Sequence, residues 1–415
     1  MGKLLLGCVA DDFTGASDAA SFLVNSGIPT MLFNGIPSSS SCLKDCLAVV
    51  IASKTRDAPA DEAVRHTLDA LGFLDECGAR QFYLKYCSTF DSTPKGNIGP
   101  TVDAVMERYD IPYTVLAPAL PINKRVVKEG VLYVDGVPLG ESHMRHHPLN
   151  PMWDSHIANL MKPQGKHPCL VLDAADMRRP KKDILSFVEN FAKGGRCYVV
   201  PEYVTDEDGH RIVEVFGHLR LLTGGSGILM PLAGHYKKAH GFSDISISES
   251  KFARKAIAIS GSCSVATKRQ IKAYHDSGGA ALHVCPSKIM SGKQSIDSVW
   301  SFVSKHKDPL IYSAELDGTQ ENAPKNAAKI LEGFFSELGA LAFENGYHCI
   351  IVAGGETSGA VILALGFDSF HIGKSVAPGV PIMTPANHAH ARLILKSGNF
   401  GQDDFFIRAF GQQTM

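Results

Sequence analysis

The chain has 415 residues, 45% of them hydrophobic and 20% charged, which is long enough for two globular domains or a large domain with a satellite. Its 41 basic and 42 acidic residues give a net charge of −1, which excludes the positive surface of a nucleic-acid-binding protein. The first apolar run ends at Asp11, too early for a signal peptide or a membrane span, and the ten cysteines include no CxxC pair. We therefore expect a cytoplasmic protein with reduced thiols and no membrane partner.

The N-terminal region is predicted to alternate short buried strands with amphipathic helices. The predicted strands are residues 4–9, 30–33, 48–52, 82–85 and 114–117, and the predicted helices are residues 61–77 and 99–109. This alternation is typical of βαβ units and indicates an α/β fold with a mainly parallel sheet.

Two adjacent carboxylates, Asp11 and Asp12, follow the first predicted strand. Ligands bind at the carboxyl edge of a parallel sheet, because loops diverge there and the next helix offers unpaired N–H groups. Gly15 and Ala16 leave room for a small ligand, so we predict Asp12 as a catalytic residue and Asp11 as a binding residue. The alternative is structural, with Thr14 as a helix cap and Asp11 as a solvated turn residue.

Cationic side chains follow two later strands, Arg56 after the third and Lys85 at the end of the fourth. A guanidinium grips a carboxylate with two bonds and an ammonium supplies a compact charge, so both are candidates for holding an anion. The alternative for Arg56 is an ordinary surface pair with a nearby acid. Because the exits of parallel strands converge, we favour an anion site. Cys87, in the polar loop after Lys85, is a weaker candidate for a nucleophile.

Residues 119–155 are irregular and rich in Pro, Gly and His, and residues 131–138 are predicted to form a hairpin with an Asp-Gly turn. The histidines have no recognisable metal-ligand spacing, so a loop that covers a substrate is the preferred interpretation. Further on, strands are predicted at 168–174 and 196–200, with a helix at 181–192.

The glycine cluster at 223–227 is either an anion cradle or a tight loop. Residues 234–252 are polar and form the best candidate for a linker. We therefore predict a first domain of residues 1–240, a linker of residues 241–251 and a second domain of residues 252–415.

The second domain opens with a strand at 256–259, the small polar turn 260–264 and a helix at 265–274. A strand, a small polar turn and a helix in this order can bind a phosphate through backbone N–H groups, without a charged side chain. Ser260 is the first polar residue of this turn. It is not a Walker loop, because the required Gly-Lys-Ser/Thr is missing. The remaining predicted elements are strands at 281–284, 309–313, 349–353 and 392–396 and a helix at 324–344.

A second glycine turn, Gly354-Gly355-Glu356-Thr357-Ser358, follows the strand at 349–353 and opens a helix. The two glycines let the backbone approach a triphosphate, and the hydroxyls of Thr357 and Ser358 can bond its oxygens. Glu356 is a candidate for holding Mg2+ or a ribose hydroxyl. The alternative is an ordinary glycine-rich turn between a strand and a helix. Lys396, at the end of the last strand, either neutralises phosphate charge or is simply an edge-strand lysine.

Three motifs, in this order, resemble those of the four-carbon acid sugar kinases. The run ADDFTGA at 10–16 is similar to the opening signature of the family, residues 85–100 resemble its 3-oxo-tetronate branch, and GGETSG at 354–359 resembles its nucleotide loop. The resemblance spans nearly the whole chain. It implies two α/β domains with a cleft between them, the first for an acid sugar and the second for ATP.

The resemblance also assigns residues. It implies that Arg56, Lys85 and Ser88 bind the carboxylate and hydroxyls of the sugar, and that Gly398 makes the last nucleotide contact. Within the segment 147–155, it implies that Asn150, Asp154 and Ser155 reach the substrate, although Trp153 departs from the expected polar residue.

The expected activity is transfer of phosphate from ATP, with Mg2+, to the 4-hydroxyl of 3-oxo-tetronate, and Asp12 would orient or deprotonate that hydroxyl. A kinase of threonate or erythronate and a non-catalytic sugar-acid sensor remain alternatives. An NAD-dependent dehydrogenase is less favoured, because the chain lacks GxGxxG in the right context.

Overall fold

The computed structural model describes residues 4–39, 43, 46–147, 150–240, 255–316, 324 and 326–412. The chain divides into two compact units, Met1–Ile245 and Ser246–Met415, called unit 1 and unit 2 below. The predicted linker, 241–251, lies outside the described residues, so the predicted domain limits stay predictions. The broader polar stretch 234–252 is not all linker, because its first residues belong to helix α8, Leu229–His240.

Unit 1 is built on a parallel sheet with the strand order β2-β3-β1-β4-β11-β5-β10-β9. Its strands are β1 (Leu6–Ala10), β2 (Thr30–Asn34), β3 (Ala48–Ala52), β4 (Gln81–Lys85), β5 (Tyr113–Ala117), β9 (Cys169–Leu172), β10 (Cys197–Pro201) and β11 (Leu221–Gly224). The strands β1, β3 and β5 are buried along their whole length, as expected for a parallel sheet covered on both faces.

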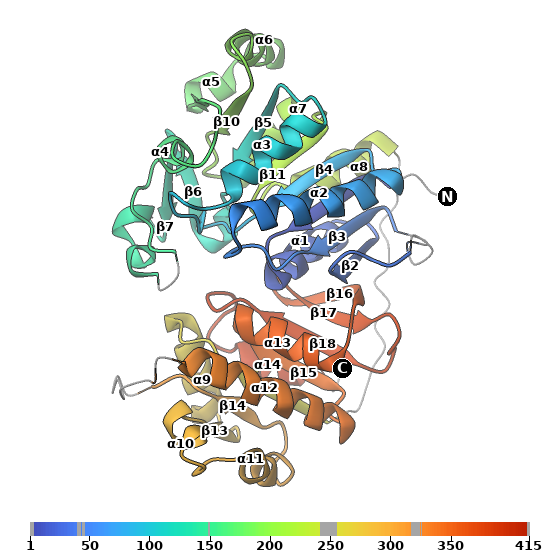
Figure 1. The fold of residues 1–415 in the computed structure, drawn as a ribbon, viewed down its shortest axis with the longest axis vertical. Coiled ribbons are helices and arrows are strands. Elements are labelled where there is room, and N and C mark those ends of the chain that lie inside the picture. The colour runs from blue at the N-terminus through green and yellow to red at the C-terminus, as the bar shows by residue number, and fades with distance from the viewer. Residues whose placement is uncertain are drawn as a thin grey trace. The chain divides into compact units, whose positions relative to one another are not determined.

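Helices cover both faces of this sheet. They are α1 (Phe13–Asn25), α2 (Ala60–Glu76), α3 (Ile98–Arg108), α4 (Ile157–Met161), α5 (Ala174–Arg178), α6 (Lys181–Ala192), α7 (Asp206–Phe216) and α8. Helices α2 and α3 pack against each other on one face, and α1 packs against α8 (Figure 1). The predicted helices over 61–77 and 99–109 are thus present, and so is the predicted α/β alternation.

A small antiparallel sheet, β6-β7-β8, extends from unit 1. It consists of β6 (Arg125–Lys128), β7 (Val131–Val134) and β8 (Val137–Pro138). The predicted hairpin is confirmed, because Val134 pairs with Val137 across Asp135 and Gly136, whose φ angles are 52° and 82°. Both residues are left-handed, as a two-residue hairpin turn requires, and the Asp-Gly pair tolerates this backbone.

Unit 2 contains a sheet with the order β13-β14-β12-β15-β18-β17-β16. Its strands are β12 (Ala256–Ser260), β13 (Ala281–His283), β14 (Leu310–Tyr312), β15 (Cys349–Ala353), β16 (Ser369–Ala377), β17 (Val380–Pro385) and β18 (Arg392–Lys396). The pairings along the series β13-β14-β12-β15-β18 are all parallel, whereas β17 is antiparallel to both β18 and β16. Sequence analysis predicted no strand in 366–391, so the hairpin β16–β17 was missed.

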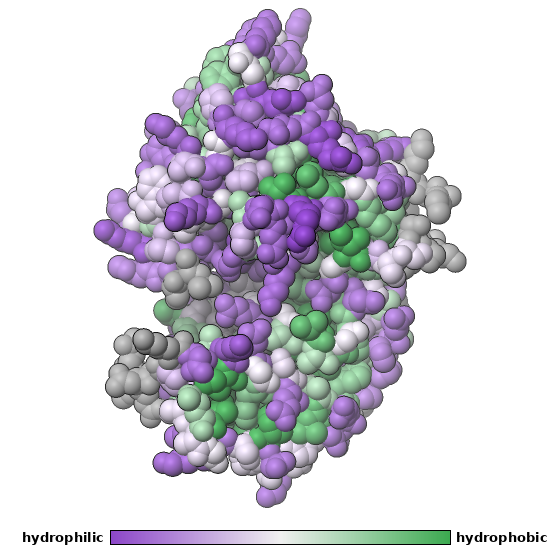
Figure 2. Space-filling model, in the orientation of Figure 1, coloured by the Kyte–Doolittle hydropathy of each residue, from purple (hydrophilic) through white to green (hydrophobic). Residues whose placement is uncertain are grey.

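The helices of unit 2 are α9 (Val265–Asp276), α10 (Pro286–Met290), α11 (Ile296–Val303), α12 (Ala327–Glu344), α13 (Gly355–Leu365) and α14 (Phe405–Gly411). A core cluster joins Ile271 and Tyr274 of α9 and Phe405 and Phe406 of α14 to the sheet. Hydrophilic side chains predominate on the visible face of unit 1, as expected where amphipathic helices cover a sheet (Figure 2). Among the described residues, no helix combines the length and apolar character needed to cross a bilayer.

Candidate functional site

The exit of β1 lies between the loops that follow β3 and β4. The Asp11 N–H donates to the Lys85 carbonyl at 3.0 Å, and the Asp11 carbonyl accepts from the N–H groups of Thr55 (2.9 Å) and Arg56 (3.1 Å). These backbone bonds continue the pairing of β1 with its neighbours past the ends of the strands. As predicted, the side chains of Asp11, Asp12, Arg56 and Lys85 therefore meet at one edge of the sheet.

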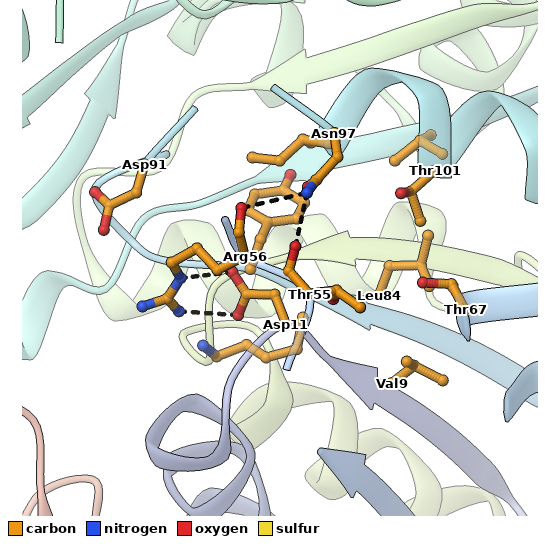
Figure 3. A pocket seen from close by; sticks show the side chains of 13 residues that line it. Val9, Asp11, Thr55, Arg56, Thr67, Leu84, Asp91, Asn97 and Thr101 are labelled. Atoms are coloured by element: carbon orange, nitrogen blue, oxygen red, sulfur yellow. Dashed lines mark hydrogen bonds and ion pairs between the residues drawn. The ribbon is translucent and has the colours of Figure 1, made fainter. Parts of the chain in front are cut away.

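The Arg56 guanidinium binds both carboxylates. Its Nε and Nη2 donate to Oδ2 and Oδ1 of Asp11 at 2.8 and 2.9 Å, and its Nη1 lies 2.9 Å from Asp12 Oδ2. Figure 3 shows the fork of Arg56 aligned on Asp11. In this structure two carboxylates of the chain occupy the fork of Arg56, so a substrate anion would share the guanidinium with them, and the predicted binding role of Arg56 stays a prediction.

Asp12, not Thr14, is the N-cap of α1. Its Oδ1 accepts the Gly15 N–H at 2.6 Å and its Oδ2 accepts the Thr14 hydroxyl at 2.9 Å. The structural alternative of a Thr14 cap is wrong, and Asp11 is paired rather than merely solvated. Asp12 thus combines a capping function with a position beside two cations.

The two carboxylates differ in acidity. Burial raises the pKa of Asp11, and the attraction of Arg56 offsets only part of this effect. Burial acts on Asp12 in the same direction, but Arg56, Lys85 and the N–H of Gly15 together outweigh it, and the pKa of Asp12 lies below its usual range. A proton added to the pair would therefore reside on Asp11, and Asp12 stays a carboxylate.

Lys85 supplies a buried cation that makes no direct ion pair in the part of the chain that the structure describes, although it attracts the carboxylates of Asp11, Asp12 and Asp18 at longer range. Its side chain is only 5% exposed, and its Nζ has no ion pair or hydrogen bond with another residue that the structure describes. A β-carbon at Gly15 would lie 2.4 Å from Asp12 Oδ1 and 2.8 Å from this Nζ, so a larger residue there would displace both functional groups. Because Lys85 also lines the pocket beside Asp11 and Arg56, its ammonium is better placed than Arg56 to receive an anion.

The loop that carries Arg56 is held by two asparagines. The Asn97 amide donates to the carbonyls of Thr55 (2.7 Å) and Arg56 (3.2 Å), as Figure 3 shows, and also to the carbonyl of Ala58 (3.0 Å). Asn150 donates to Asp57 Oδ1 at 2.7 Å. Sequence analysis predicts no role for Asn97, although this residue stands in the 85–100 motif. The structure indicates a structural role, because the side-chain amide of Asn97 donates hydrogen bonds to three carbonyls of one turn.

Several other candidate residues make contacts within their own loops. Asp154 accepts the N–H groups of Ser155 and His156, both at 2.7 Å, and the Ser155 hydroxyl accepts the Gly140 N–H at 2.8 Å. Neither residue is among those that line the pocket beside Asp11, and their predicted contacts with substrate stay predictions. Burial raises the pKa of Cys87 to about 11, which disfavours a thiolate nucleophile.

The glycine cluster at 223–227 packs backbone against backbone. β-Carbons at Gly224, Gly225 and Gly227 would collide with carbonyl oxygens of residues 117, 118 and 119. The tight-loop interpretation therefore explains the cluster. Ser88, a predicted sugar-binding residue, is half-buried beside this glycine cluster. A β-carbon added at Gly225 would lie 3.5 Å from the β-carbon of Ser88.

In unit 2, the predicted nucleotide residues also come together at one sheet edge. Ser260, Ala353 and Lys396, at the ends of β12, β15 and β18, are register partners in adjacent parallel strands. The turns that follow them touch: a β-carbon at Gly261 would collide with Thr357 Oγ1, and one at Gly398 would lie 2.7 Å from Ser262 Oγ. The segments 260–264, 354–358 and 397–398 thus form one contiguous surface.

This surface offers unpaired donors. The first helical bond of α13 runs from the Ser358 N–H to the Gly354 carbonyl, so the N–H groups before Ser358 point out of the helix end. Gly354 has φ +120°, a backbone that other residues rarely adopt. The buried hydroxyls of Ser260 and Ser358 have no hydrogen-bond partner among the described residues. Gly355 and Glu356 are exposed at the start of the helix. Such a helix N-terminus with free hydroxyls fits a phosphate chain.

Comparisons with known proteins agree with this division. Residues 6–232 match a family model described as a sugar-binding N-terminal domain, and residues 257–406 match one described as a nucleotide-binding C-terminal domain. The two units therefore define a protein that pairs a sugar-binding with a nucleotide-binding domain.

Curated relatives specify the family further. The chain is 39% identical to a 3-oxo-tetronate kinase of Salmonella typhimurium, covering 98% of both chains, and 38% identical to one of Haemophilus influenzae, covering 98% of this chain and 99% of the relative. It is also similar to crystal structures of a Salmonella typhimurium protein (TM-score 0.86, 39% identity, 98% of each chain) and a Haemophilus influenzae protein (0.78, 36%, 98% of this chain and 100% of that one). The chain belongs to the four-carbon acid sugar kinase family, within its 3-oxo-tetronate branch.

Proposed function

We propose that the protein is an ATP-dependent kinase that phosphorylates the 4-hydroxyl of 3-oxo-tetronate to give 3-oxo-tetronate 4-phosphate. The observation that carries the proposal is the meeting, at the sheet edge of unit 1, of Asp12, whose pKa is lowered, and the buried ammonium of Lys85, which has no direct ion pair among the described residues. A small sugar acid needs a cation for its carboxylate and a carboxylate for its reacting hydroxyl, and this edge supplies both.

In unit 1, the Lys85 ammonium would bind the substrate carboxylate, with Ser88 and Arg56 beside it. Asp12 would orient the 4-hydroxyl and accept its proton late in the transfer. Its three hydrogen-bonded or ionic partners hold the carboxylate in one orientation. Its lowered pKa makes it a weak base, so orientation is its larger contribution.

In unit 2, the segments 260–264, 354–358 and 397–398 would hold ATP. The N–H groups at the start of α13 and the hydroxyls of Ser260, Thr357 and Ser358 fit phosphate oxygens. Bound ATP supplies the phosphoryl group. Mg2+ takes most of its ligands from phosphates and water, with one or two protein carboxylates, and the exposed Glu356 is our candidate for such a ligand.

The substrate is tested by turnover. We would incubate the protein with Mg2+, ATP and each of a panel of tetronates and 3-oxo-tetronates, follow ADP release, and locate the phosphate by phosphorus NMR. The proposal predicts the highest kcat/KM with a 3-oxo acid and phosphate on the 4-oxygen. Faster turnover of threonate or erythronate would reassign the substrate, and binding without ADP release would favour a sensor.

A further inference from the structure

Lys396 is a buried lysine without an acidic partner among the described residues. Its side chain is fully buried, and its Nζ lies at hydrogen-bond distance from Thr267 Oγ1 (2.9 Å), the Gly398 carbonyl (2.9 Å) and the Ser397 carbonyl (3.1 Å). The ammonium donates to all three, whereas a neutral amine donates to the two carbonyls and accepts from the Thr267 hydroxyl. Lysine is rarely buried so completely without a carboxylate, because removing an ammonium from water is costly. The hydrogen-bond partners of Lys396 Nζ are all uncharged groups.

The contacts of Lys396 tie together the loops of the nucleotide surface. The Gly398 carbonyl also accepts from the hydroxyls of Ser264 (2.6 Å) and Thr267 (2.8 Å), and the Lys396 carbonyl accepts the Gly354 N–H at 2.9 Å. One side chain therefore links the end of β18 and α9, while its own backbone anchors the glycine turn that opens α13. All of these segments lie where the phosphates would bind.

We propose that Lys396 is a positioning residue of the nucleotide site, whose buried ammonium fixes the loops around the phosphates and becomes stably charged when a polyanionic nucleotide binds. The inference rests on the proposed binding of ATP to unit 2. A phosphate chain nearby supplies the negative potential that the protein itself lacks there. Nucleotide binding is therefore coupled to uptake of a proton by Lys396.

The surroundings of Lys396 support this coupling. The Phe405 ring of α14 lies 5.7 Å from its Nζ, and its neighbour on β15, Ala353, is apolar. Charged residues on the surrounding helices are half-buried or exposed: Lys268, Arg269, Glu356, Asp404 and Arg408. Burial, rather than any of these charges, lowers the pKa of Lys396 to about 7. At about pH 8, roughly nine in ten ligand-free molecules would then carry it neutral.

Calorimetry tests the coupling directly. The full chain would be titrated with Mg2+ and a non-hydrolysable ATP analogue at about pH 8, in HEPES and in Tris, whose ionisation enthalpies differ. Proton uptake appears as a buffer-dependent binding enthalpy, and we expect an uptake approaching one proton per site. The same titration of Lys396→Gln measures any proton that the analogue itself releases or takes up, and this contribution is subtracted.

Two variants separate charge from structure. Lys396→Gln keeps hydrogen-bond donors without charge, Lys396→Met removes both, and Lys272→Met removes an exposed lysine of α9 that pairs with Asp276. We expect both Lys396 variants to lose the proton uptake and about tenfold or more in affinity, and Lys272→Met to keep both.

The outcomes are distinct. Tight binding with equal enthalpies in the two buffers, or uptake that persists in Lys396→Gln, would overturn the role of Lys396. If Lys396→Gln folds poorly, Lys396→Met supplies the same correction. If the unmodified chain does not bind the analogue, the proposed nucleotide site itself is wrong.

Discussion

Replacing Arg56 tests the sugar site most directly. In Arg56→Ala, the chain loses a guanidinium that contacts both Asp11 and Asp12 and leaves their carboxylates side by side. A substrate carboxylate that shares this guanidinium would lose one charge-assisted bond, worth about 1.5 to 3 kcal/mol, or roughly ten- to a hundredfold in an equilibrium constant. We expect the KM for 3-oxo-tetronate to rise toward the upper end of this range, because the two unmasked carboxylates also repel the anionic substrate.

Steady-state kinetics with each substrate varied in turn would measure the effect. The KM for ATP should be nearly unchanged, because the candidate nucleotide residues belong to the other unit. Lys166→Ala serves as the matched control, since it removes an exposed cation of unit 1 that pairs with Glu107. Circular dichroism at the assay pH would establish that each variant is folded.

Two further variants separate the charge of Arg56 from its bidentate geometry and test the repulsion between the carboxylates and the substrate. Arg56→Lys keeps the charge but not the bidentate fork, so its KM should be intermediate. Adding Asp11→Asn to Arg56→Ala removes part of the repulsion and should recover part of the lost affinity. An equal rise of the KM for both substrates, or an unchanged KM for the acid sugar in folded Arg56→Ala, would refute the assignment.

Three other changes have defined outcomes. Gly355→Val should abolish binding of an ATP analogue by calorimetry without lowering the unfolding temperature, because Gly355 is exposed at the start of α13; retained affinity would place the phosphates elsewhere. Asp12→Asn keeps a capping residue and should lower kcat about 100-fold or more with both KM values little changed. Because the pKa of Asp12 is lowered, the pH profile of kcat for the unmodified enzyme should show no acidic limb from Asp12 above about pH 5. If such a limb is present and the variant loses it, Asp12 is a base of ordinary strength. For Lys396, a folded-state pKa of about 7 against 10.5 in the unfolded chain means that the unfolded chain binds more protons between these values. The ligand-free protein should therefore gain stability as pH rises through this window, by up to about 1.4 kcal/mol per pH unit, and denaturant titrations of Lys396→Met should lack this slope.

The sequence was sufficient to predict the strands that are buried on both faces. Continuous apolar runs such as 48–52 and 349–353 coincide with β3 and β15, because a parallel sheet covered by helices needs unbroken hydrophobic strands. The hairpin β16–β17 was missed although Pro378 and Gly379 stand at its turn and Gly379 has φ +76°. In both strands, buried residues are interrupted by half-buried ones, and in β16 also by exposed ones, which is a weaker pattern than a continuous apolar run.

The residues of the sugar site were predictable, but their partners were not. Asp11, Asp12, Arg56 and Lys85 each follow a strand, so their meeting at one edge follows from the parallel fold. The choice of acid by each cation depends on the strand order β3-β1-β4 and on how far each side chain reaches. Neither of these can be predicted from the local sequence. For this reason, the sequence assigned Arg56 and Lys85 the same role, whereas the structure pairs one and leaves the other without a partner among the described residues.

The pairing of Arg56 with Asp11 and Asp12 also bears on how the product leaves. Together with Lys85, these side chains bring two positive and two negative charges to the edge, and Asp91 adds a third carboxylate to the pocket lining. The ligand-free site therefore has no excess positive charge. If the acid sugar binds here as proposed, its carboxylate would lie beside the ammonium of Lys85, and no further cation among the lining residues would balance the phosphate of the product. We therefore expect phosphorylation to weaken the hold of unit 1 on its ligand, so that turnover itself favours release.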